Sequence, residues 1–257
     1  MTKILTIVVG LAIMSGIATA QTDTMYIMKA GVVINKYNVS NQVDSVIFYK
    51  PTVTAAPIGT VTYGSTTDQN GNTVKTVTIG TQTWFAENLK VTTYNDGTTI
   101  PNVTDATTWV NDTTGAQCSY NNADSNVATY GRLYNWYALN TAKLCPTGWH
   151  LPSDDEWAIL STTLGGDITS GGALKETGTT HWLSPNTGAT NTSGFSALPS
   201  GYRDEDGTFS GLGSYSGWWS PTKAITGYAN NRNLYDNYSY FYYNLHVSGF
   251  SVRCLRN

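Results

Sequence analysis

The chain has 257 residues, a formal net charge of −3 and only 12% charged residues. The sequence contains no cluster of basic residues that would attract a nucleic acid or an anionic membrane. We therefore expect no nucleic-acid partner. Glycine and tyrosine are abundant, with 25 and 17 residues, which is typical of exported proteins rich in strands and loops. The length allows one sizeable domain with an appendage.

The first twenty residues have the pattern of a signal peptide. Lys3 supplies the positive charge, an apolar run extends from Ile4 to Met14, and residues 18–20 (ATA) form a cleavage site of the A-x-A type. The apolar run is too short to span a bilayer, and no second such run follows in the sequence. We therefore expect residues 1–20 to be removed and the mature protein to be secreted or held at the cell surface without a transmembrane segment.

Two short regions are expected before the main domain. Residues 21–50 predict a small β segment, because residues 25–34 alternate around a turn at Ala30-Gly31 and residues 43–48 suit a further strand. Residues 51–58 contain proline and alanine without periodicity, which is typical of a linker. The main domain is then expected over residues 59–257.

Two helices are predicted within the main domain. Ser153 and Glu156 form a capping box, and apolar residues follow on one helical face up to the glycine pair at 165–166, namely Trp157, Leu160 and Leu164. The second helix is expected over residues 130–140, where apolar side chains recur at helical spacing. The remaining sequence predicts short strands and turns, with a terminal strand over residues 249–255.

Three cysteines, Cys118, Cys145 and Cys254, are present in a chain that we expect to be exported. One disulfide and one remaining thiol are the arithmetic expectation. We favour a bond between Cys145 and Cys254, which ties the entry of the capped helix to the last strand, with Cys118–Cys254 as the alternative. Because no C-x-x-C pair is present and the histidines are scattered, we expect no metal site.

Motifs of common catalytic sites are missing from the sequence. No G-x-S-x-G, G-x-x-x-x-G-K or H-E-x-x-H pattern occurs. His150 is expected to donate to a backbone carbonyl, and His181 and His246 have no sequence-adjacent acid or nucleophile, so we interpret all three as structural. The acidic residues at 204–206 suit a charged hairpin turn better than a calcium loop. We therefore expect neither an enzyme nor a cofactor.

Several polar residues lie in apolar surroundings. Glu87 and Asn88 follow an apolar pair, and Arg203 and Arg253 lie in apolar strands. An internal ion pair or a hydrogen bond to the backbone explains each of them without a ligand.

The segment from Tyr228 to Asn244 contains six tyrosines and five asparagines. Such a composition is typical of recognition surfaces, because tyrosine offers a large contact area with few rotors and asparagine offers adaptable hydrogen bonds. The alternative is that the tyrosines simply favour strands. By the period of two, residues 238, 240 and 242 share a face. The predicted ligand-binding residues are Tyr228, Asn230, Asn231, Tyr235, Asp236, Asn237, Tyr238, Tyr240, Tyr242 and Asn244.

Six ordered motifs resemble one family over roughly residues 59–257. They are GTQTWFAENL (80–89), YGRLYNWYA (130–138), CPTGWHLPSDDEW (145–157), GYRDEDGTF (201–209), WWSPT (218–222) and GFSVRC (249–254). Together they resemble the Fibrobacter succinogenes major paralogous domain. This resemblance implies an α+β domain of the C-type lectin-like fold, with two helices, mixed short-stranded sheets and paired N- and C-terminal strands. The preceding β segment resembles one that is common in exported Bacteroidetes proteins.

The resemblance also sets expectations about function. It implies a secreted or surface protein, and with the tyrosine-rich segment we expect a non-catalytic binding module for a glycan or protein ligand at the cell exterior. One alternative is a structural or adhesin subunit whose N-terminal β segment pairs with a neighbour's sheet edge. Another is a remnant of a formylglycine-generating enzyme, because the LPSDDEW motif also resembles the helix start of that enzyme family. Such enzymes use a reactive cysteine pair near their end, where this chain has only Cys254.

Overall fold

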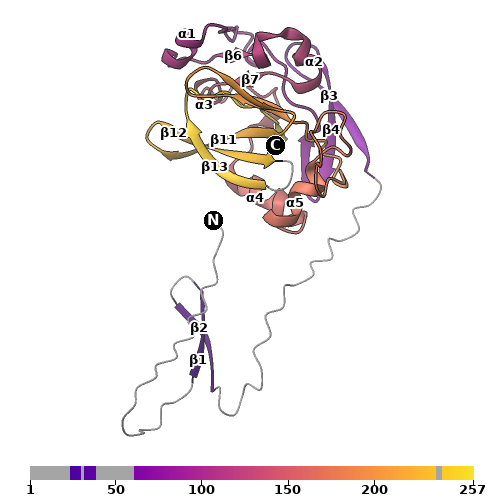
Figure 1. The fold of residues 1–257 in the computed structure, drawn as a ribbon, viewed down its shortest axis with the longest axis vertical. Helices are drawn as coiled ribbons and strands as arrows, with labels where there is room; N and C mark the ends of the chain where they lie inside the picture. Colours follow the sequence, from indigo (N-terminus) through magenta and orange to yellow (C-terminus); the bar gives the residue numbers. More distant parts are fainter. Residues whose placement is uncertain (1–23, 30–31, 39–60, 236–238) are drawn as a thin grey trace. The chain divides into compact units, whose positions relative to one another are not determined.

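The computed structural model describes residues 24–29, 32–38, 61–235 and 239–257. The chain divides into two compact units, residues 1–52 and residues 53–257. Within the first unit, β1 (Thr24–Lys29) and β2 (Val32–Asn38) form an antiparallel hairpin with an irregularity between Ile27 and Met28 (Figure 1). The predicted signal peptide, the strand at 43–48 and the linker at 51–58 lie outside the described residues.

One sheet of the second unit joins the two ends of the main domain. Its strand order is β3-β4-β5-β14-β8. Leu255 near the end of the chain pairs with Trp84 of β5 and with His150 of β8. The expected pairing between early and late strands is therefore present. The strands are β3 (Tyr63–Thr67), β4 (Thr73–Ile79), β5 (Gln82–Phe85), β8 (Trp149–His150) and β14 (Leu255–Arg256).

A second sheet has the order β10-β9-β11-β12-β13, which places β13 at its edge. Its pairings are antiparallel except for a parallel bridge between Ser216 of β11 and Gly201 of β9. The strands are β9 (Ser200–Arg203), β10 (Phe209–Leu212), β11 (Tyr215–Ile225), β12 (Tyr228–Tyr235) and β13 (Ser239–Leu245). A further pair consists of β6 (Gln117–Cys118) and β7 (Leu133–Tyr134). The described fold is thus α+β, with several short antiparallel and mixed sheets.

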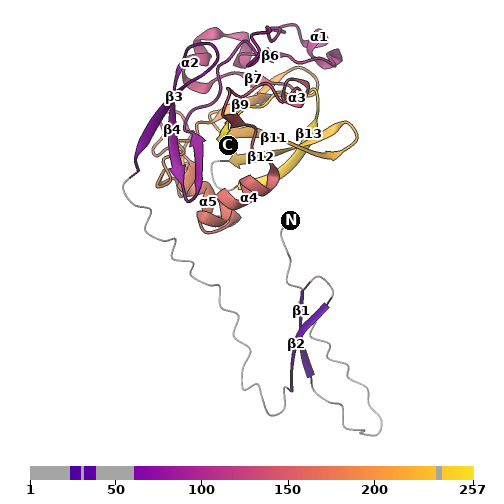
Figure 2. The same cartoon turned by 180° about the vertical axis from the view of Figure 1, so that it is seen from behind.

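The predicted capping box begins the longest helix of the described residues, α4 (Asp154–Thr163). The Ser153 hydroxyl accepts from the backbone N–H of Glu156, and the Glu156 carboxylate accepts from the N–H of Ser153 at 2.8 Å. A second helix of similar size, α5 (Asp167–Leu174), follows directly and lies beside α4 (Figure 2). Its first residue accepts a hydrogen bond from Ser161 of α4 at 2.5 Å.

The prediction of one helix over residues 130–140 is wrong. A short helix, α2 (Val127–Tyr130), ends at Gly131, whose φ of +78° breaks the helical run. After β7, the Asn135 side chain accepts from the N–H of Ala138 and starts a separate helix, α3 (Trp136–Asn140). Three more short helices complete the described elements: α1 (Ala106–Asn111) and the 3₁₀ turns η1 (Tyr120–Asn122) and η2 (Asp124–Asn126).

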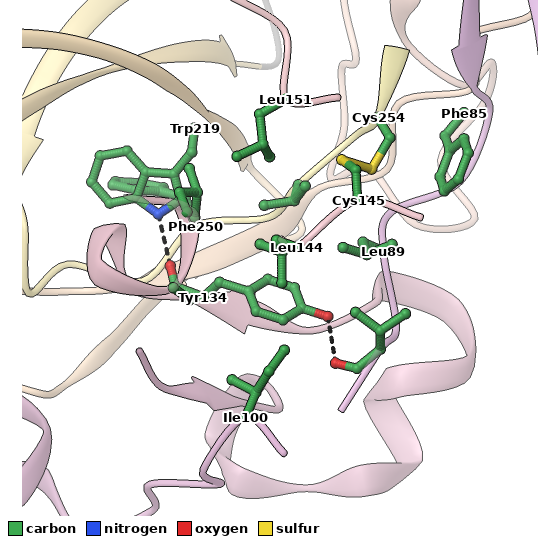
Figure 3. Packing of buried hydrophobic residues seen from close by; sticks show 14 of the residues in the cluster. Phe85, Leu89, Ile100, Tyr134, Leu144, Cys145, Leu151, Trp219, Phe250 and Cys254 are labelled. Carbon is green, nitrogen blue, oxygen red and sulfur yellow. Dashed lines mark hydrogen bonds between the residues drawn. A yellow bond between two sulfur atoms is a disulfide. The ribbon is translucent and has the colours of Figure 1, made fainter. Parts of the chain in front are cut away.

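The largest hydrophobic cluster surrounds the disulfide between Cys145 and Cys254 (Figure 3). The favoured pairing is therefore confirmed, and the alternative with Cys118 is wrong, because Cys118 is a buried free thiol on β6. Figure 3 also shows how polar atoms are satisfied inside this cluster: Trp219 Nε1 donates to the Tyr134 carbonyl at 2.7 Å, and the Tyr134 hydroxyl donates to the Val91 carbonyl at 2.8 Å. Buried polar atoms of aromatic side chains need such partners.

A second cluster holds α4 against the sheets. Trp157 is 1% exposed and lies 4.6 Å from Trp84, measured between ring centroids. Phe195 and Trp218 pack on the same ring at 6.0 and 6.1 Å. The predicted apolar face of the helix is therefore its buried face.

Candidate functional site

A polar pocket of about 400 Å³ lies within the second unit, among β4, the segment after β5, α2 and the segment that follows α5. In Figures 1 and 2 the segment that follows α5 runs beside β4. Most lining side chains are polar or charged, unlike the mainly apolar lining of typical small-molecule sites. The lining residues are Lys75, Ala86, Glu87, Asn88, Ala128, Thr129, Glu176, His181, Ser196, Leu198 and Arg253.

The alternation of β4 places Lys75 at the pocket. Val74 and Thr76, which flank Lys75 and point to the opposite face of the strand, are buried, whereas Lys75 is exposed. The chain after β5 stays in register with β4, because the Ala86 N–H donates to the Lys75 carbonyl at 2.8 Å. Lys75 returns a bond from its own N–H to Glu87 Oε1 at 3.3 Å. Two strands that are adjacent in the sequence thus supply one wall.

Glu176 and His181 form a hydrogen-bonded pair on the opposite segment. Glu176 Oε2 lies 2.8 Å from His181 Nδ1, and both side chains are just over a quarter exposed. The backbone of Glu176 is anchored, because its N–H donates to Ala197 O and its carbonyl accepts from Asn186 Nδ2. A carboxylate at Nδ1 fixes the tautomer of a neutral imidazole and leaves Nε2 as an acceptor. The pair therefore offers an oriented polar group to a ligand.

Aromatic rings lie next to these polar groups. The Tyr130 ring meets the His181 ring edge-on, with centroids 5.9 Å apart. Burial, and secondarily the charge of Glu176, raises the pKa of the Tyr130 hydroxyl. On the other wall, the Tyr63 hydroxyl lies 3.2 Å from Ser196 Oγ, and the Tyr63 ring is 41% exposed. The surroundings of the pocket thus combine hydrogen-bonding groups with ring faces.

Asn88 and Arg253 form the back of the pocket, and several hydrogen bonds hold each of them. Asn88 donates to Tyr130 O and accepts from Trp218 Nε1 at 2.9 Å and from Arg253 Nε at 3.0 Å. Arg253 also donates to the carbonyls of Phe85, Phe195 and Ser196. Burial lowers the pKa of Arg253 to about 9, against the opposing effect of Glu87, so its guanidinium is charged at neutral pH.

The internal hydrogen bonds expected of these polar residues are confirmed. Arg203 also makes the expected internal bond: its side chain is buried, with 1% exposure of the residue, and its Nε donates to Gly207 O at 3.0 Å. The acidic turn at residues 204–206 is present as expected, because the Asp204 N–H donates to Thr208 O at 2.7 Å between β9 and β10. Among the described residues, no group of three or more histidine, cysteine or acidic side chains could hold a metal ion.

The structure engages the described part of the tyrosine- and asparagine-rich segment in the scaffold. Asn231 is fully buried and donates to Asn233 Oδ1 at 2.7 Å, so this side chain does not lie at the surface where a ligand contact was predicted. Asn230 is partly buried and donates to Asp154. Tyr235 is partly buried and packs edge-on against Tyr215 at 5.0 Å. Tyr228, at the start of β12, is also partly buried.

The other predicted contacts are described in part or not at all. Asp236, Asn237 and Tyr238 lie outside the described residues. For three positions of β13 the structure gives only the strand register, which pairs Tyr240 with Asn233, Tyr242 with Asn231 and Asn244 with Ala229. Of the predicted ligand contacts whose side chains the structure describes, namely Tyr228, Asn230, Asn231 and Tyr235, none is among the lining residues of the pocket.

The partners of His150 differ from the prediction. His150 does not donate to a backbone carbonyl; its Nε2 lies 2.8 Å from Glu156 Oε1 and its Nδ1 lies 2.7 Å from Asn257 Oδ1. His246 stacks on Trp136 with centroids 3.8 Å apart. His181 lines the pocket, which sequence reasoning missed. The available signal was an acid five residues before it, at Glu176.

The main domain is thus an α+β domain with mixed sheets, a disulfide bond between Cys145 and Cys254, and a polar pocket. Residues 77–256 match the model of the Fibrobacter succinogenes major domain, and the chain belongs to this family. No curated protein and no solved structure matches the chain. Among the described residues, no helix has the length and apolarity that crossing a bilayer requires.

Proposed function

We propose that the protein is a non-catalytic binding module of the cell exterior, with a C-type lectin-like arrangement, that holds a glycan in the polar pocket. The observation that carries this proposal is the lining of the pocket. A glycan presents hydroxyl groups that both donate and accept, and the pocket offers a carboxylate–imidazole pair, hydroxyls of Thr129 and Ser196, and the charged Lys75 and Glu87.

The rings beside the pocket support a sugar over other polar ligands. The C–H faces of sugars pack on aromatic rings while their hydroxyls bind polar groups. Tyr63 and Tyr130 supply such rings, and each contacts a lining residue. The ligand is therefore a molecule with both apolar faces and many hydroxyls.

We propose binding rather than turnover because both acidic lining residues are already engaged. Glu87 pairs with Lys90 at 3.0 Å, and Glu176 pairs with His181 at 2.8 Å. Their contacts orient the wall of the pocket. A glycosidase instead needs two carboxyl groups that act directly on the scissile bond.

Placement outside the cell rests on two observations. The Cys145–Cys254 disulfide is of a kind that persists in oxidising compartments. The sequence also begins with the pattern of a signal peptide.

A second candidate function is recognition of a protein at the edge strand β13, the position of Tyr240 and Tyr242. The observation that favours it is the strand order, which leaves β13 at the end of its sheet. An exposed sheet edge can accept an added strand from a partner.

A glycan-array screen with the purified exported protein tests the proposal. We expect His181→Ala to weaken binding of the best glycan by about tenfold, which is about 1.4 kcal/mol. The matched control is His150→Gln, because His150 also bonds a glutamate but does not line the pocket. Loss of binding in Tyr240→Ala or Tyr242→Ala, with His181→Ala unaffected, would instead place the site at β13. A wild-type protein that bound no glycan would refute the glycan ligand.

A further inference from the structure

The charged groups of the pocket differ in whether they already have an ion-pair partner. Glu87 forms an ion pair with Lys90, and Glu176 is hydrogen-bonded to His181. For Lys75, no carboxylate among the described residues lies within 4 Å of the ammonium. The pocket thus contains a cation without a direct ion-pair partner among the described carboxylates.

The ammonium of Lys75 is nevertheless held in place. It lies over the ring of Tyr63, 4.9 Å from the centroid. A cation–π contact of this kind orients a lysine without removing its charge or its capacity to donate hydrogen bonds. The same tyrosine bonds Ser196, another lining residue. Lys75 is thus a positioned donor at the mouth of the site.

A second positive charge lies behind the first. Arg253 is buried and bonded to carbonyl and amide oxygens, with no carboxylate of the described chain within 4 Å. Neutral acceptors satisfy its N–H groups but leave its net charge in place. A charge inside a low-dielectric wall acts over a longer range than one in water. Lys75 and Arg253 thus bring two positive charges to the pocket, and neither has a carboxylate of the described residues within 4 Å.

We infer that the pocket selects a sugar that carries a carboxylate, such as a uronic acid, and that Lys75 is the residue that recognises the acid. This inference rests on the proposed function, because it specifies the ligand of the same pocket. The carboxylate pairs with the Lys75 ammonium, and the sugar hydroxyls bind the Glu176–His181 pair. A charge-assisted bond of this type is about twice as strong as a neutral one.

The test compares acidic glycans with neutral forms of the same skeleton. Oligosaccharides of polygalacturonate, alginate and hyaluronan are each titrated calorimetrically against the wild type, together with their carboxyl-methyl-esterified forms. We expect the best acidic ligand to bind at least about tenfold more tightly than its ester, and we expect this preference to weaken as salt rises. Neutral cello- and mannooligosaccharides complete the panel.

Two lysine variants locate the effect. Lys75→Gln is expected to remove the preference for the acid while retaining the weak binding of the ester. Lys223→Gln is the matched control, since the Lys223 ammonium also lies over an aromatic ring, 5.2 Å from the centroid of Trp136, and does not line the pocket. Thermal melts confirm that both variants are folded.

The outcomes separate the two proposals. Binding of neutral glycans alone, with dependence on His181, would overturn the selection of acids and leave the glycan pocket standing. An acid preference that survives in Lys75→Gln would overturn the role of Lys75. If no glycan of the panel or the array bound, both proposals would fail.

Discussion

The guanidinium of Arg253 links its own segment to two others that are far from it in the sequence, residues 85–88 and residues 195–196. It donates to the carbonyls of Phe85 and Ser196 at 3.2 and 3.1 Å and to the amide oxygen of Asn88 at 3.0 Å. Its planar face also lies 4.1 Å from the centroid of Phe195. Only the fork of an arginine reaches several acceptors in one plane. This one side chain therefore fixes the back of the pocket to the two walls.

Arg253→Lys tests that role, because it keeps the charge but cannot reproduce the fork. Each lost bond to a charged group is worth about 1.5 to 3 kcal/mol, so we expect the free energy of unfolding to fall by at least about 2 kcal/mol. Urea denaturation measures the change. Arg256→Lys, at an exposed position, is the control and should stay within about 0.5 kcal/mol of the wild type. An unchanged midpoint for Arg253→Lys would show that the bonds contribute little.

At the scale of one element, the start of α4 links helix capping to pH. Partial burial raises the pKa of Glu156, but the hydrogen bonds from Ser153 and His150 lower it by more, so that the net shift is downward. A carboxyl whose pKa is lower in the folded state stabilises the fold above its unfolded pKa of about 4.3. This stabilisation is lost as the pH falls through that range toward the folded pKa.

Glu156→Gln is accordingly expected to destabilise the protein by about 1 kcal/mol at pH 7. The difference from the wild type should narrow at pH 3, where the wild-type carboxyl is increasingly protonated. Denaturant melts at the two pH values measure it. Asp155→Asn, in the same helical turn but exposed, is the control with a smaller expected effect. A difference that was constant with pH would mean that the charge of Glu156 has no part in the cap.

Elements with local signals were predictable from the sequence, whereas elements that depend on distant contacts were not. The capping box and the apolar spacing of α4 are properties of neighbouring residues. In α5, by contrast, Gly172 is required because a side chain there would meet Gly188 O at 2.2 Å. The sequence of α5 contains the pair Gly171-Gly172, and because glycine disfavours the helix interior, its local pattern did not predict a helix. The two-residue strands β6, β7 and β8 are likewise too short to produce a period and exist only through their partners. The alternation over residues 249–255 predicted a terminal strand, but the structure has only isolated bridges at residues 249–251 and the two-residue strand β14.

The pocket was hidden for the same reason. Its lining comes from β4, the segment after β5, α2, the segment after α5 and the last residues before β14. Lys75 and Arg253 have no pattern in common along the chain, and only folding brings them together. The tyrosine-rich segment was the more visible signal because its composition is local, but the structure buries Asn231 and engages Asn230 with α4.

At the scale of the whole molecule, the disulfide constrains the largest part of the domain. Cys145 and Cys254 are 109 residues apart in the sequence. A loop of that length is worth about 4 to 5 kcal/mol in the chain-entropy model. Reduction should therefore lower the free energy of unfolding by up to this amount, which urea melts with and without reductant would measure.

Thiol alkylation supplies the control for that experiment. Burial raises the pKa of Cys118 to about 11, so this thiol is protonated and unreactive in the folded protein. Mass spectrometry should find no alkylated cysteine in the native protein, one after unfolding without reductant, and three after reduction. The Cys118→Ser variant should keep its sensitivity to reductant. Three modified cysteines without reductant would contradict the disulfide.

The same covalent link determines how the domain responds to mechanical tension. A pull on the chain at β14 passes through Cys254 to Cys145, so the stretch between these cysteines, which are 109 positions apart, cannot lengthen. At roughly 3.5 Å per residue, about 380 Å of chain is withheld from extension. Lengthening is confined to the part before Cys145, which carries Lys75 and Glu87, while Glu176, His181 and Arg253 lie inside the locked loop. Tension therefore separates one wall of the pocket from the other while the locked loop keeps its length.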